Sequence, residues 1–76
     1  MTASELQDLI IRTLVRTAGG SPRRWRSAVG PIKLYDSATH SHCNWSIAPL
    51  GDVRDVARIE RLMDTMRLDH PIVIEG

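Results

Sequence analysis

Two segments with helical periodicity, one near each end of the 76-residue chain, constrain the fold more than any other feature. The first runs from about Ser4 to Ala18. Thr2 and Glu5 have the spacing of a capping box at its start, and Gly19 is typical of a helix end. Apolar residues recur at helical spacing and predict a stripe that faces the core: Leu6, Leu9, Ile10, Leu14 and Ala18.

The second helical segment begins after the strand-breaking sequence Pro49-Leu50-Gly51 and extends to about Leu68. Asp52 is a good N-cap residue, and Asp55 stands at the end of the helix where a negative charge is favourable. Its apolar stripe again has helical spacing and consists of Val56, Ile59, Leu62, Met63 and Met66.

Between the two helices, short extended segments are separated by turn residues. Arg24 to Val29 is the first, and Gly30-Pro31 supplies a turn before the second, Ile32 to Asp36. Cys43 to Ala48 is the clearest, because apolar and polar residues alternate along it. Ile72 to Ile74 predicts a last short strand at a sheet edge.

The element order is therefore α-β-β-β-α, with a possible terminal β. Two amphipathic helices need a common surface to cover, which predicts an α+β fold: a two-layer sandwich with both helices on one face of a small sheet. The loops are too short for crossover connections, so the sheet should be mainly antiparallel. We expect residues 1–76 to form a single domain.

The charges are unevenly distributed along the chain. Six bases and no acid lie between Leu9 and Tyr35, whereas seven acids and four bases follow from Asp36 onward, although the net charge is only +1. This asymmetry favours a polyanionic or acidic partner. No glycine-rich phosphate loop opens a helix, and no catalytic signature is present, so we expect a binding module and not an enzyme.

Strand parity predicts where a binding surface lies. If Trp25 and Trp45 point towards the helices, the other face of the sheet is basic and carries one aromatic ring. The candidate binding residues are Arg23, Arg24, Arg26, Lys33, Tyr35 and Asn44, with Arg16 at the edge. Such a face suits nucleic acid, and an acidic protein surface is the alternative partner. It could also be an ordinary solvated face whose charged residues protect the sheet edges.

A second basic surface is predicted on the C-terminal helix. Arg54, Arg58 and Arg61 recur at i, i+4 and i+7 on the side opposite the apolar stripe. This arrangement could follow a phosphate backbone. The alternative is an exposed helix face whose charge is balanced by Glu60 and Asp64.

Ile11 and Val15 widen the apolar arc of the first helix beyond what one contact face needs. Either the core wraps around these two residues, or a second copy of the chain covers them. A homodimer through Ile11 and Val15 is therefore a possible partner arrangement.

His40, His42 and Cys43 carry atom types that bind zinc, but their spacing matches no familiar structural zinc pattern. The same residues could be drawn as a Cys–His nucleophile pair, although so short a chain suggests no cleft for it. We expect no metal and no cofactor. A single cysteine and an N-terminus unlike a signal peptide predict a cytoplasmic protein, and no apolar run is long enough to enter a membrane.

Overall fold

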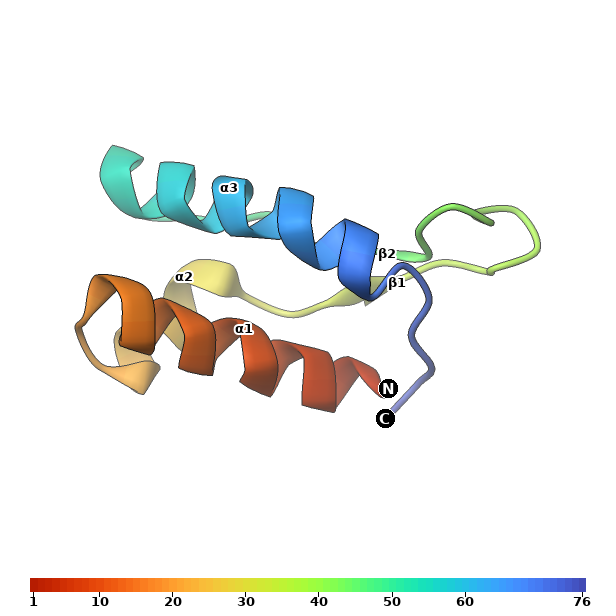
Figure 1. The fold of residues 1–76 in the computed structure, drawn as a ribbon, viewed down its shortest axis with the longest axis horizontal. Helices are drawn as coiled ribbons and strands as arrows, with labels where there is room; N and C mark the ends of the chain where they lie inside the picture. The colour runs from red at the N-terminus through yellow and green to blue at the C-terminus, as the bar shows by residue number, and fades with distance from the viewer.

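The computed structural model describes residues 1–76 and contains three helices and a two-stranded antiparallel sheet (Figure 1). The predicted α+β fold class is confirmed. The two ends of the chain lie side by side, and the Ser4 backbone N–H donates to the Gly76 carbonyl oxygen at 2.9 Å. The elements in chain order are α1 (Ala3–Ala18), α2 (Pro22–Val29), β1 (Lys33–Leu34), β2 (Trp45–Ser46) and α3 (Val53–Asp69).

Helix α1 begins with the predicted capping box. The Glu5 backbone N–H donates to Thr2 Oγ1 at 3.1 Å, and the Thr2 backbone N–H donates to Glu5 Oε1 at 2.9 Å. The pKa of Glu5 is lowered below its usual 4.5. The hydrogen bond with the Thr2 backbone is the main cause, and the interaction with the Thr2 side chain is the next. The helix ends at Gly19, whose φ of 78° is readily reached only by glycine.

The prediction of a strand over Arg24 to Val29 is wrong, because these residues belong to helix α2. Ser21 is its N-cap, and its hydroxyl oxygen accepts a hydrogen bond from the Arg24 backbone N–H at 3.1 Å. Pro22 occupies the first turn, where its missing N–H costs nothing. Gly30 closes the helix with a φ of 70°.

The sheet is much smaller than the sequence predicts. Each strand has two residues, with Lys33 opposite Ser46 and Leu34 opposite Trp45 in antiparallel register. The predicted C-terminal strand is reduced to one parallel bridge between Thr2 and Ile74. The open face of a three-stranded sheet, on which the predicted binding surface depends, is therefore absent.

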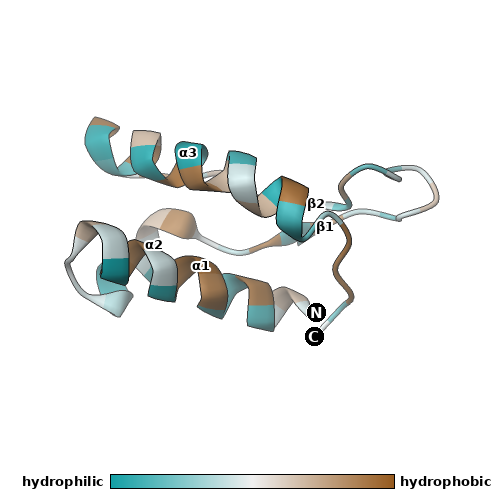
Figure 2. Cartoon of the chain, in the orientation of Figure 1, coloured by the Kyte–Doolittle hydropathy of each residue, from teal (hydrophilic) through white to brown (hydrophobic).

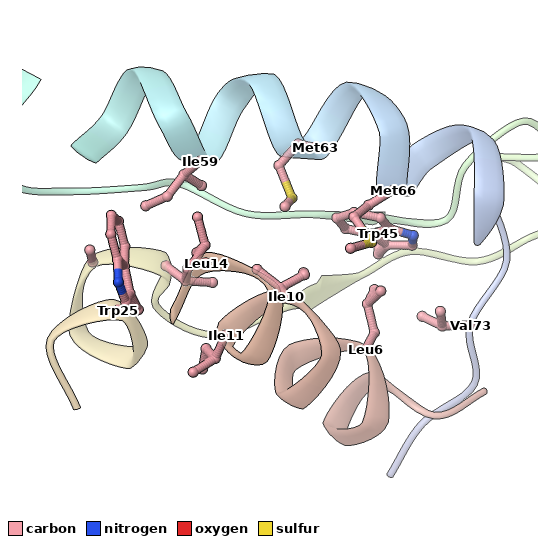
Figure 3. Packing of buried hydrophobic residues seen from close by; sticks show 12 residues of the cluster. Leu6, Ile10, Ile11, Leu14, Trp25, Trp45, Ile59, Met63, Met66 and Val73 are labelled. Carbon is pink, nitrogen blue, oxygen red and sulfur yellow. The ribbon is translucent and has the colours of Figure 1, made fainter. Parts of the chain in front are cut away.

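The core lies where the helices meet, and not under a broad sheet (Figure 3). Asp52 caps α3 as predicted, since its Oδ1 accepts from the Arg54 backbone N–H at 2.7 Å. Figure 2 shows the hydrophobic bands along α1 and α3 among their hydrophilic residues. Trp25 and Trp45 are both buried, as predicted. The core consists of Leu6, Ile10, Ile11, Leu14, Trp25, Ala28, Val29, Trp45, Ile59, Met63, Met66 and Val73.

Helix α2 explains the wide apolar arc of α1. Ile11 points away from α3 (Figure 3) and is only 2% exposed, because α2 packs against this side of α1. Of the two alternatives, the core wraps around Ile11, so this residue offers almost no surface to a second subunit. Val15 is half-buried. Self-association itself stays a prediction.

Candidate functional site

The seven residues predicted to form one basic face do not share a surface. Arg23, Arg24 and Arg26 lie on α2, and Arg16 lies on α1. Lys33 and Tyr35 lie in or next to β1, whereas Asn44 is buried in the interior. The structure therefore separates the predicted site into groups with different surroundings.

Arg24 forms an ion pair that connects helix α2 to helix α3. Its Nη2 lies 2.7 Å from Asp55 Oδ1 and 2.8 Å from Oδ2, and its Nε donates to Oδ2 at 3.3 Å. The hydrogen bonds and charge of Asp55 raise the pKa of the Arg24 guanidinium above its ordinary value. Asp55 is buried and Arg24 joins it to α2, so this arginine is already neutralised within the chain.

Asn44 was predicted to face outward, and this placement is wrong, because the residue is only 6% exposed. Its Nδ2 donates to the Val73 carbonyl oxygen at 2.8 Å, and its Oδ1 accepts from the Val73 backbone N–H at 2.9 Å. The Asn44 backbone N–H donates to the Pro71 carbonyl oxygen at 3.0 Å. Asn44 thus fastens the C-terminal segment to the body of the protein.

Tyr35 is a poor platform for stacking. His40 lies against its ring, with 4.5 Å between ring centroids and 24° between planes. The Lys33 Nζ lies 5.5 Å from the ring centroid, and the Tyr35 hydroxyl is 3.1 Å from Ser46 Oγ. These contacts compete with a nucleic-acid base for the Tyr35 ring.

A hollow with a volume of about 440 Å³ lies between α1 and α2. We call it the α1/α2 groove. Most of its surface is carbon, although three guanidinium groups and one carboxylate stand around it. It is lined by Asp8, Ile11, Arg12, Val15, Arg16, Pro22 and Arg26.

The charges around the groove are only partly paired. Arg26 Nη2 lies 3.4 Å from Asp8 Oδ1, and both side chains are more than half exposed. Arg12 Nε donates to the Asp8 carbonyl oxygen at 3.4 Å, but neither Arg12 nor Arg16 has a carboxylate within 4.0 Å. Sequence reasoning left Arg12 and Asp8 out of the site. The signal that could have found them is the spacing of Arg12 and Arg16, one turn apart beside Val15.

The second predicted basic surface is present as a geometric feature. Arg54, Arg58 and Arg61 are all exposed on α3. Ile59 and Met63 are buried on the opposite side of the helix. We call these three arginines the α3 arginine stripe.

His40, His42 and Cys43 do not converge. The His40 ring lies on Tyr35, and the Cys43 thiol lies 3.4 Å from the Trp45 carbonyl oxygen. No group of three or more His, Cys, Asp and Glu side chains comes together in a way that could hold a metal ion. The loop therefore gives no geometric support to either the zinc or the nucleophile alternative.

Comparison with family models, with curated proteins and with solved structures finds no match to this chain. None of the three helices combines the length and the apolar character needed to cross a membrane. Function must therefore be argued from the surfaces described above.

Proposed function

We propose that this chain is a non-enzymatic binding module that holds an acidic protein segment in the α1/α2 groove. The observation that carries the proposal is the combination of a carbon-lined floor with Arg12 and Arg16, which have no carboxylate partner. An apolar side chain of the partner would cover Val15, while neighbouring carboxylates would pair with the two guanidinium groups. Arginine forms its strongest hydrogen bonds with carboxylates and phosphates, so the match is one of charge as well as shape.

A protein segment suits this groove better than nucleic acid does. No aromatic side chain lines it, so bases would find no ring on which to stack. Asp8 stands at its edge and would repel a phosphate backbone. A peptide can place an apolar side chain and two carboxylates at chosen positions clear of Asp8, whereas the charges of a phosphate backbone follow one another at a fixed spacing.

Selection from a random 16-residue peptide display library tests the proposal without a known partner. We expect the wild-type protein to enrich peptides in which two or more Asp or Glu residues flank a large apolar residue. The double variant Arg12→Ala, Arg16→Ala should bind the selected peptides about 2- to 30-fold more weakly, from about 0.2–1 kcal/mol for each exposed pair.

The matched control is Arg58→Ala, Arg61→Ala, which removes the same charge from α3 and should leave peptide affinity unchanged. A second variant, Val15→Asp, places a carboxylate in the groove floor and should abolish binding of the same peptides. Enriched peptides without an acidic bias, or equal losses in the two double variants, would show that the groove does not recognise acidic segments. Oligonucleotide binding that depends on Arg12 and Arg16 would instead support the nucleic-acid hypothesis for this surface.

A further inference from the structure

The α3 arginine stripe differs in chemistry from the α1/α2 groove. Arg54, Arg58 and Arg61 follow one line along the helix, because residues at i, i+4 and i+7 return to the same side. The helix rises by about 10 Å over the seven steps from Arg54 to Arg61, at about 1.5 Å a step. The stripe is thus a row of three positive charges on a rigid element.

None of these three arginines is neutralised within the chain. The ion pairs of the protein are Arg24 with Asp55, Arg26 with Asp8, and Arg67 with Asp64. On α3, Glu60 stands about 100° around the helix from Arg61, since each residue turns by that angle. Asp64 is closer, since it is three residues from Arg61 and thus about 60° around the helix, but its Oδ1 already lies 3.6 Å from Arg67 Nη1. The acids Glu60 and Asp64 therefore flank the stripe at its Arg61 end.

Two hollows without an acidic residue in their lining, each of about 260 Å³, adjoin the stripe. A third hollow, of about 440 Å³, is lined by Arg61 together with Glu60 and Asp64. Arg58 and Arg61 line both of the hollows without acids. The Thr65 hydroxyl in the first hollow has no hydrogen-bond partner within the chain and can donate to an anion. The first is lined by Leu14, Thr17, Ala18, Arg58, Arg61, Leu62 and Thr65, and the second by Arg54, Ala57, Arg58 and Arg61.

From this we propose that the α3 arginine stripe binds the phosphate backbone of duplex nucleic acid. One strand of a duplex presents a phosphate about every 3.4 Å along the axis, so about 10 Å of helix faces about three phosphates. The two hollows that Arg58 and Arg61 share have no acidic lining, which favours an anion with repeated charge over a peptide. The residues that line the two hollows include no aromatic ring, so the surface contacts the backbone and reads no sequence. This inference is independent of the α1/α2 groove and of the acidic segment proposed for it.

The experiment is a fluorescence anisotropy titration with a labelled 20-base-pair DNA duplex, an RNA duplex of the same sequence and the single DNA strand. Measurements at 50 and 200 mM KCl give the salt dependence. Three phosphate contacts predict a slope of log affinity against log salt of about −2.7, which is a loss of about 40-fold over this fourfold range. The duplexes should bind more tightly than the single strand, because no ring near the stripe rewards unstacked bases.

The triple variant Arg54→Ala, Arg58→Ala, Arg61→Ala should lose this binding and its salt dependence. It should still fold, because the side chains are exposed and alanine is the strongest helix former, and circular dichroism checks this. The control Arg23→Ala, Lys33→Ala, Arg67→Ala removes the same charge from positions outside both the stripe and the α1/α2 groove, and it should bind like the wild type. The proposal is overturned if the wild type binds neither duplex at 50 mM KCl, if the control loses as much affinity as the stripe variant, or if the single strand binds more tightly than the duplexes.

Discussion

The buried amide of Asn44 yields the sharpest prediction about stability. Its two hydrogen bonds, at 2.8 and 2.9 Å, satisfy both backbone groups of Val73, which is only 2% exposed. Asn44→Ala leaves this N–H and this C=O without a partner in the interior. An unsatisfied buried polar group costs about 1–3 kcal/mol, so the variant should lose about 2–6 kcal/mol of unfolding free energy. A domain of this size has only about 4–11 kcal/mol in total, so the loss is a large fraction of its stability.

Urea unfolding monitored by tryptophan fluorescence measures the loss, and amide hydrogen exchange at Val73 locates it. If the C-terminal segment detaches before the rest unfolds, the free energy of that detachment limits the measured loss, and exchange at Val73 becomes fast. The matched control is Ser46→Ala, two residues along the chain, which removes a hydroxyl near Tyr35 and should cost about 1 kcal/mol or less. An Asn44→Ala protein with wild-type stability and a still protected Val73 amide would refute the structural role of this side chain.

Two further predictions concern the core and the first helix. Trp45→Ala should destabilise the protein by about 3–5 kcal/mol, because the indole is 2% exposed and its Nε1 donates to the His70 carbonyl oxygen at 2.8 Å. Chemical denaturation measures the loss of unfolding free energy. A variant that stays folded, unfolds cooperatively and loses less than this would contradict the prediction. Glu5→Gln tests the capping box. The lowered pKa of Glu5 means that its charge stabilises the fold above about pH 4.5 and that this contribution is lost as the pH falls through the lower folded-state value. The wild type should therefore have the higher melting temperature near pH 7, and the difference should shrink as the pH falls through the folded-state pKa of Glu5. A difference that is constant with pH would exclude the charge as its cause.

The sequence predicts the long helices well because their signals are local. The capping box at Thr2 and Glu5, the N-cap at Asp52 and the apolar stripes all act within a few residues, and each is found in the structure. The burial of Trp25 and Trp45 is also predicted correctly. Trp45 lies in a strand, as expected. Trp25 lies in a helix instead of the predicted strand, but both spacings place it on the apolar side.

Helix α2 was missed although its signals were present. The pair Ser21-Pro22 follows the end of the first helix and is a good start for a new one, with serine as N-cap and proline in the first turn. Trp25 and Val29 fit both a strand and a helix, because a separation of four is even and also close to one helical turn. Ala28 distinguishes the two, since it is buried beside Val29 and neighbouring strand residues would face opposite sides.

The candidate site depended on contacts that no local pattern reveals. Asp55 follows Arg24 by 31 residues and Val73 follows Asn44 by 29, so only the folded chain brings each pair together. Parity placed Asn44 outward because it is polar in an alternating run. The structure satisfies it inside, where an amide side chain can substitute for a strand partner of the C-terminal segment.

The charge asymmetry of the sequence overstates the binding surface of its first half. Of the six bases between Leu9 and Tyr35, Arg24 is neutralised by Asp55 of α3, and Arg26 is paired with Asp8 of α1. The ion pair between Arg24 and Asp55 also buries one acid of the C-terminal half, so this acid contributes little to the surface charge. The cations that remain unpaired on α3 are therefore more prominent than the surplus of acids after Asp36 suggests. Two basic surfaces with different linings result, a carbon-floored groove and a stripe of three arginines without carboxylate partners. The double variant Arg12→Ala, Arg16→Ala changes only the groove, and the triple variant Arg54→Ala, Arg58→Ala, Arg61→Ala changes only the stripe. Together they test whether one small chain binds both an acidic protein segment and a duplex.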